Sequence, residues 1–180
     1  MRLLLGVSGG IAAYKACELV RIATKAGAEV RVVMTEHATR FVGPLTFETL
    51  SGHPVLLDTF QGGESGTIDH IAWAKWPTVA AVAPLTANTL GKLACGLADD
   101  ALSTVMMALP RGVPVVLGPA MNTEMWFNPV VQRNLAWLAD LGRYTVVEPI
   151  DKALACGDVG RGGLAEPETL WQALQEANVS

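Results

Sequence analysis

Continuous apolar runs alternate along the chain with segments in which apolar residues recur at helical spacing. Residues 2–7 form the first run, as expected of a parallel strand that is buried on both faces. Residues 11–26 then carry an apolar side at helical spacing and end at Gly27, a residue that suits a helix C-terminus. This pattern predicts a strand, a glycine turn and a helix, and the unit recurs along the chain.

The rest of the sequence continues this alternation. Further strands are predicted at residues 29–34, 55–57, 78–83, 113–118 and 144–147. Helices are predicted at residues 69–75, 86–95, 100–109, 129–141 and 168–177, and two short helical pieces meet at Pro44. Residues 61–67 and 151–167 are rich in glycine and lack periodicity, so they are predicted as loops. The alternation predicts one domain at residues 1–180, a three-layer αβα sandwich with a Rossmann-like, mostly parallel sheet.

Sheets of this kind bind ligands beyond the carboxyl ends of their strands. Four irregular segments follow predicted strands there: Ser8-Gly9-Gly10, Thr35-Glu36-His37, residues 84–89 and residues 119–126. The first turn is neither GxGxxG nor a P-loop. A glycine turn before a helix offers free N–H groups to an anion, although tight packing of helix on strand accounts for the same glycines equally well. The hydroxyl-rich turns beside it favour a mononucleotide pocket.

Composition narrows the class of protein. Hydrophobic residues make up 51% of the chain and charged residues 17%, against about 25% charged in an average domain. No apolar run approaches the roughly 18 residues of a membrane span. The sequence therefore predicts a globular protein with more apolar surface than one copy needs, and hence a homo-oligomer.

Charge and cysteine usage exclude further classes. The net charge is −4 and the 13 basic residues are scattered, which argues against a nucleic-acid partner. The three cysteines are widely spaced, and no His/Asp/Glu cluster accompanies them, so neither a disulfide framework nor a metal site is predicted. Cys17 and Cys95 are predicted to lie in the core and His53 in a turn. The short first apolar run does not suit a secretion signal, so a cytoplasmic location is expected.

Four ordered motifs carry a resemblance to a known family. They are Ser8-Gly9-Gly10-Ile11-Ala12-Ala13, Thr-Ala-Asn-Thr at residues 86–89, Pro-Ala-Met-Asn-x-x-Met-Trp at 119–126 and Leu-Ala-Cys-Gly-Asp-x-Gly-x-Gly at 154–162. Over nearly the whole chain, they resemble the homo-oligomeric flavin-containing cysteine decarboxylase family. The resemblance implies FMN as cofactor, phosphopantothenoylcysteine as substrate and phosphopantetheine as product, in coenzyme A biosynthesis. It also implies homotrimers, sometimes built into homododecamers, with FMN sites between subunits.

The resemblance also implies a role for individual residues. His70 would be the base, Cys156 the acid and Asn122 the group that binds the cysteine carboxylate, with Met121 and Ala155 beside the substrate. Cys156 would lie on a mobile, substrate-covering loop at residues 151–167. FMN would be held by Ser8, Gly9, Gly10, Ile11, Thr35, Glu36, His37, Thr86, Ala87, Asn88, Thr89 and Ala120.

The chemistry of an acylated cysteine explains why these groups are needed. Direct loss of CO2 would leave an unstabilised carbanion, so an electron sink is required, and FMN can supply one. Oxidation to a thioaldehyde lets CO2 leave and gives an enethiol, which is then reduced again while a cysteine thiol donates a proton. The Asn122 amide would orient a carboxylate without neutralising the charge that must depart. A closed glycine loop would exclude water.

The same residues are also compatible with different roles. His70 could only position the substrate, Cys156 could be a small buried residue, Met125 and Trp126 could be packing, and acidic residues 99–100 suit a helix N-terminus. A peptidyl-cysteine decarboxylase of the lantibiotic type stops at the enethiol and needs no acid. A flavin prenyltransferase lacks the asparagine motif and the cysteine loop. A non-enzymatic flavin-binding regulatory subunit would not need the three catalytic residues together.

The sequence departs from the family pattern in two respects. Gly163 and Leu164 stand where the family usually has Arg or Ala and then Met. Leucine conserves the volume of methionine, so activity is expected to survive. Many bacterial relatives carry a fused ligase domain. The chain ends at Ser180, so it is expected to be either a standalone decarboxylase or a part of a longer protein.

Overall fold

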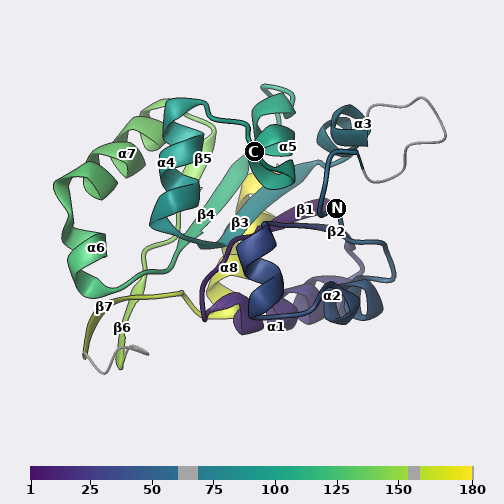
Figure 1. The fold of residues 1–180 in the computed structure, drawn as a ribbon. Helices are drawn as coiled ribbons and strands as arrows, with labels where there is room; N and C mark the ends of the chain where they lie inside the picture. Colours follow the sequence, from purple (N-terminus) through teal and green to yellow (C-terminus); the bar gives the residue numbers. More distant parts are fainter. Residues whose placement is uncertain (61–68, 154–158, 180) are drawn as a thin grey trace.

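A five-stranded parallel sheet forms the centre of the computed structural model, which describes residues 1–60, 69–153 and 159–179 (Figure 1). The strands lie in the order β2-β1-β3-β4-β5. Strands β3 and β4 are buried at every residue, because helices cover both faces of the sheet. The bounds are β1 (Arg2–Val7), β2 (Glu29–Met34), β3 (Val79–Leu85), β4 (Val115–Pro119) and β5 (Tyr144–Val146).

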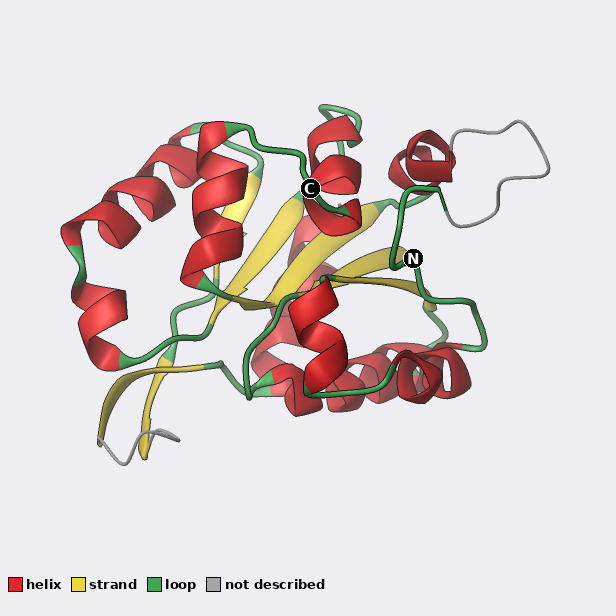
Figure 2. Cartoon of the chain, in the orientation of Figure 1, coloured by secondary structure: helices red, strands yellow, loops and turns green. Residues whose placement is uncertain are grey.

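Helices pack on the two faces of this sheet and make the predicted αβα sandwich, which is thereby confirmed (Figure 2). Successive residues of β1 point to opposite faces, so that Leu3 and Leu5 join one core and Leu4 the other. The first core is closed by α1 (Ala13–Lys25), α2 (Pro44–Ser51) and α8 (Pro167–Val179). The second is closed by α3 (Asp69–Lys75), α4 (Ala87–Cys95), α5 (Ala101–Ala108) and α7 (Pro129–Asp140).

Smaller elements lie around this frame, and some differ from the sequence prediction. The segment after β4 contains a one-turn helix, α6 (Thr123–Phe127), and the turn after β2 is a 3-10 helix, η1 (Glu36–Arg40). The predicted strand at residues 55–57 is wrong, because only Leu56 bridges to β2, at Val33. The predicted loop at residues 151–167 contains the antiparallel strands β6 (Ile150–Ala153) and β7 (Val159–Gly163).

The cysteines and histidines outside the predicted site have ordinary surroundings. Cys17 packs partly buried against the first core, as predicted, and burial raises the pKa of its thiol. Cys95 is exposed at the last residue of α4, so its predicted core position is wrong. His53 follows the left-handed Gly52 that ends α2, in the predicted turn. No helix in the described part of the chain has the length and apolar character needed to cross a membrane.

The strand order places a topological switch in the middle of the sheet. From β1 the chain moves to β2 on one side and then to β3 on the other, so the connections after β1 and β3 run to opposite faces. The loops diverge at that point and leave a crevice at the carboxyl ends of the strands. Doubly wound sheets of this order bind their ligand there, between the first and third strands.

Candidate functional site

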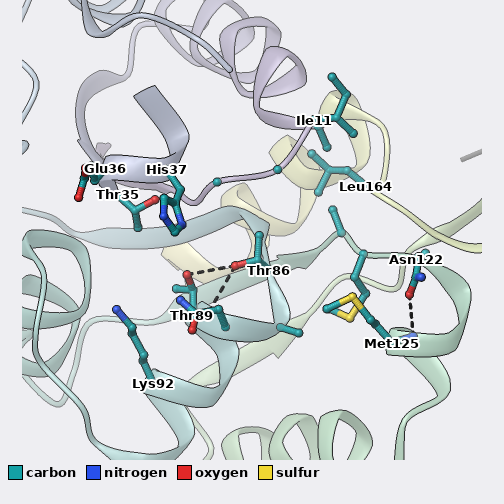
Figure 3. A pocket seen from close by; sticks show the side chains of 18 of the residues that line it. Ile11, Thr35, Glu36, His37, Thr86, Thr89, Lys92, Asn122, Met125 and Leu164 are labelled. Carbon is teal, nitrogen blue, oxygen red and sulfur yellow. Dashed lines mark hydrogen bonds between the residues drawn. The ribbon is translucent and has the colours of Figure 1, made fainter. Parts of the chain in front are cut away.

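A cavity of about 710 Å³ opens at this switch point, within the size range of small-molecule sites. Two groups of residues face each other across it (Figure 3). The "turn half" comprises residues 9–12, 35–37 and 86–89, together with Lys92, Asp99 and Asp100. The "hairpin half" comprises residues 120–122, Met125 and residues 162–164. The structure thus brings together nearly all residues predicted to hold a cofactor.

The first turn has no room for a side chain at Gly9. A Cβ on Gly9 would overlap the Cβ of His37, because the turns after β1 and β2 touch at this point. Helix α1 begins immediately afterwards. Among the described residues no acceptor receives the backbone N–H groups of Ile11 and Ala12. These groups at the N-terminus of a 13-residue helix can bind an anion.

Ser8 supports this turn from beneath and does not line the cavity. Its side chain is completely buried. The Oγ donates to the carbonyl of Pro84 at 2.7 Å and accepts from the backbone N–H of Thr86 at 3.0 Å. The residue predicted to touch the cofactor is therefore placed to lock the turns after β1 and β3 together.

Two threonines shape the remaining turns of this half. Thr35 caps η1, and its Oγ1 accepts from the N–H of Ala38 at 3.2 Å. Thr86 caps α4, and its hydroxyl lies 3.2 Å from that of Thr89. Capping stabilises each helix start, so the backbone of residues 35–37 and 86–89 is fixed where it borders the cavity.

Asn122 occupies the opposite wall as the N-cap of α6. Its Oδ1 accepts from the backbone N–H of Met125 at 2.8 Å (Figure 3). This bond assigns the side-chain orientation, because the amide oxygen must face the helix. The residue is exposed, and its NH2 group is left to donate to a ligand. The same turn brings Met125 to the cavity wall, as the three-residue spacing in the motif could have indicated.

A charged cluster at the cavity was not predicted. Lys92 Nζ lies 2.7 Å from Asp99 Oδ1 and 2.7 Å from Asp100 Oδ2. Hydrogen bonds to Asp100 and Asp99 raise the pKa of Lys92. Burial alone would raise the pKa of Asp100, but hydrogen bonds from Lys92 and Ser103 outweigh it and lower that pKa. Asp100 is also the N-cap of α5, in a capping box with Ser103, as expected for residues 99–100.

The predicted base and acid are not both found at this cavity. His70 lies on α3, which packs against α5, and it does not line the cavity of the single chain. Its Nδ1 is buried and has no hydrogen-bond partner among the described residues. Cys156 and Ala155 lie outside the described residues. Within the described ranges, no three His, Cys, Asp or Glu side chains come together in a way that could hold a metal ion.

Comparisons with known proteins match nearly the whole chain. The Flavoprotein family model matches residues 1–178. A bifunctional coenzyme A biosynthesis protein of Bacillus subtilis is 51% identical over 167 residues, which cover 93% of this chain and 40% of that protein. The chain therefore spans less than half the length of this relative.

Two further matches cover both chains almost completely. A Streptococcus mutans protein named "Probable phosphopantothenoylcysteine decarboxylase" is 45% identical over 175 residues, covering 97% of each chain. A solved structure of a Cys→Ser variant of PPC decarboxylase, complexed with pantothenoylaminoethenethiol, superposes with a TM-score of 0.90 at 36% identity. That match covers 99% of this chain and 98% of the second chain.

Proposed function

The chain belongs to the Flavoprotein family, and we propose that it is a phosphopantothenoylcysteine decarboxylase, an FMN-dependent carboxy-lyase that forms phosphopantetheine in coenzyme A biosynthesis. The observation that carries the proposal is the arrangement of one cavity: an anion-binding glycine turn on one side and the free amide of Asn122 on the other. A cofactor phosphate and a substrate carboxylate each find a donor there.

The turn half fits a flavin mononucleotide. Its uncapped N–H groups at α1 suit a phosphate, and strand order 2-1-3-4-5 is that of sheets that bind FMN at the switch point. Ile11, Ala12 and Ala87 supply apolar surface for a flat ring system. Bound FMN would supply a two-electron acceptor for the cysteine side chain and return the electrons after CO2 has left.

The hairpin half suits the substrate. The Asn122 NH2 is neutral, so it can orient a carboxylate without stabilising its charge against departure. Met121, half-buried on the same segment, supplies an apolar contact. Cys156 is proposed as the proton donor for the carbon that loses CO2, with Ala155 beside the substrate, on the substrate-covering segment 151–167.

We assign His70 to the cavity of a neighbouring subunit. The buried Nδ1 of His70 has no partner among the described residues, so it can hydrogen-bond to a group of a neighbouring copy. Ile11 and Met125, at the rim of the cavity, are 59% and 44% exposed, which favours a neighbouring copy that covers them. A homotrimer, or a homododecamer built from trimers, satisfies both observations. The enzyme is proposed to act in the cytoplasm as a single domain over residues 1–180.

Spectroscopy and product analysis test the proposal. The purified protein should be yellow, with flavin absorbance at about 450 nm. It should also release CO2 from phosphopantothenoylcysteine under anaerobic conditions. Asn122→Asp keeps a helix cap but places a carboxylate opposite the substrate's, so turnover should be lost while flavin absorbance remains. A colourless protein that fails to bind added FMN would refute the cofactor assignment. Turnover of a C-terminal cysteine peptide in preference to the small substrate would identify a peptidyl-cysteine decarboxylase instead.

A further inference from the structure

Lys15 is a buried lysine on the helix that begins at the cavity. Only 8% of the residue is exposed. Its Nζ donates to the backbone carbonyl of Leu164 at 3.1 Å and to Glu166 Oε1 at 2.9 Å. Burial of an ammonium group is unfavourable unless it is paired and hydrogen-bonded. The lysine therefore holds residues 164–166, which lie between β7 and α8, against α1.

That segment forms part of the cavity wall. Leu164 lines the cavity close to Ile11, the first side chain after the glycine turn (Figure 3). Its side chain is 2% exposed and fills the space over Gly118, where a Cβ would lie 3.0 Å from Leu164 Cδ1. A carbonyl bonded to Lys15 and a side chain packed on β4 fix this position from two directions.

The strand before Leu164 packs directly on the segment that carries Asn122. The N–H of Met121 donates to the carbonyl of Gly162 at 2.9 Å. Gly162 has a φ of +145°, and a Cβ there would overlap the carbonyl oxygen of Met121. A Cβ on Gly160 would meet the hydroxyl of Thr123 at 2.5 Å. Strand β7 and residues 121–123 are thus in backbone contact, and a shift of one displaces the other.

We propose that Lys15 is a positioning residue for substrate binding. It holds Leu164 and Glu166 to α1, this anchor fixes β7, and β7 fixes Asn122 through the Met121–Gly162 bond. The Leu164 bond carries most of the effect, because it is buried, whereas the Glu166 side chain is 52% exposed and its ion pair is screened. The effect on substrate rests on the proposed function, but the mechanical effect on residues 121 and 162 does not.

The test compares Lys15→Met with Lys25→Met, which removes an exposed lysine from the same helix. Lys15→Met leaves the Leu164 carbonyl without its donor, so the Met121 amide should exchange hydrogen about tenfold faster. KM for phosphopantothenoylcysteine should rise about tenfold, equivalent to about 1.4 kcal/mol. The FMN dissociation constant and kcat should stay within about twofold. Lys15→Arg, which keeps a donor, should restore part of the protection, and Lys25→Met should match the wild type.

Several results would overturn the proposal. Unchanged exchange at Met121 would show that the anchor does not reach Asn122. Equal losses of FMN and substrate affinity, or an equal effect of Lys25→Met, would reduce Lys15 to general stabilisation of α1. If Lys15→Met does not fold, Glu166→Ala should still accelerate exchange at Met121 by about twofold, and no acceleration would count against the anchor. A wild-type protein without decarboxylase activity would refute the proposed function, while the exchange measurements would still decide the role of Lys15.

Discussion

The turn half and the hairpin half of the cavity are built by different means. In the turn half, a buried side chain joins two loops: Ser8, after β1, bonds to Pro84 and Thr86 at the end of β3. Thr35 and Thr86 cap the following helices. In the hairpin half, backbone lies on backbone, and glycines at 160 and 162 allow the approach. The first half therefore depends on hydrogen-bonding side chains of the central fold, and the second on close packing of an added hairpin.

The substitution with the largest expected effect disrupts the turn half alone. Gly9→Ala places a Cβ on His37, so one of the two turns must move away from the cofactor. Overpacking costs about 1–3 kcal/mol, so we expect FMN affinity to fall by up to about 100-fold. Titration with FMN, followed by quenching of its fluorescence, measures this. Gly43→Ala, at a site with open space around it, is the matched control. Retained FMN affinity in Gly9→Ala would contradict the assignment of this turn.

A corresponding glycine substitution disrupts the hairpin half. Gly162→Ala combines a positive φ with an overlap on Met121, so β7 must separate from residues 121–123. We expect kcat/KM to fall about 30-fold, roughly 2 kcal/mol, with FMN affinity unchanged. Steady-state kinetics on flavin-loaded protein check this, with Gly112→Ala in an open turn as control. If FMN is lost as well, the two halves are not independent.

Two substitutions that each remove a hydroxyl group compare how the two halves contribute to the free energy of unfolding. Ser8→Ala leaves the Thr86 N–H without its partner and leaves the Pro84 carbonyl with only the longer bond from the residue 8 N–H, at 3.3 Å, so the free energy of unfolding should fall by about 2 kcal/mol. In the hairpin half, the buried Thr123 hydroxyl has no partner among the described residues, so Thr123→Val should be neutral or slightly stabilising. Denaturant unfolding of both variants measures the difference. Equal destabilisation would remove the distinction drawn between the halves.

The smallest expected effect concerns the charged cluster of Lys92, Asp99 and Asp100. The folded pKa of Asp100 is lowered, so its contribution to stability is present above the ordinary carboxyl pKa of 3.8 and is lost as the pH falls through the folded value. Asp100→Asn keeps the helix cap and removes the charge. We expect a loss of about 0.5 kcal/mol at neutral pH, which persists down to the ordinary carboxyl pKa of 3.8 and declines as the pH falls below it. Unfolding curves across this range check it, and a constant difference would exclude the charge as its source.

The sequence predicted the turn half better than the hairpin half, for a physical reason. Buried parallel strands are uniformly apolar, so the run at residues 2–7 marked a strand and the glycines after it marked a turn at the sheet edge. In β7, by contrast, contacts with residues 121–123 require glycine at positions 160 and 162. Glycine has no side chain, so the alternation of apolar and polar residues by which strands are predicted is absent from β7. The hairpin was therefore predicted as a loop.

Pairings between distant segments were also beyond prediction. Lys15 resembles any lysine on a helix until the segment at Leu164 is packed beside it. Lys92 meets Asp99 and Asp100 only because the chain reverses between α4 and α5. The resemblance implied a role for His70 but not its place, because nothing in the local sequence indicates which cavity its side chain would reach. The family resemblance supplied what the local pattern lacked.

The double use of Asn122 has a consequence for redesign of the enzyme. The oxygen of its amide caps the N-terminus of α6, and the nitrogen is the group proposed to bind the substrate. Serine, threonine and aspartate also cap helices. Substituting one of them for Asn122 therefore keeps the helix cap but changes the hydrogen-bonding group that the residue offers to a ligand. The hairpin half is thus the place where a library of variants can seek new acyl-cysteine substrates without disturbing the flavin or the expression of the protein.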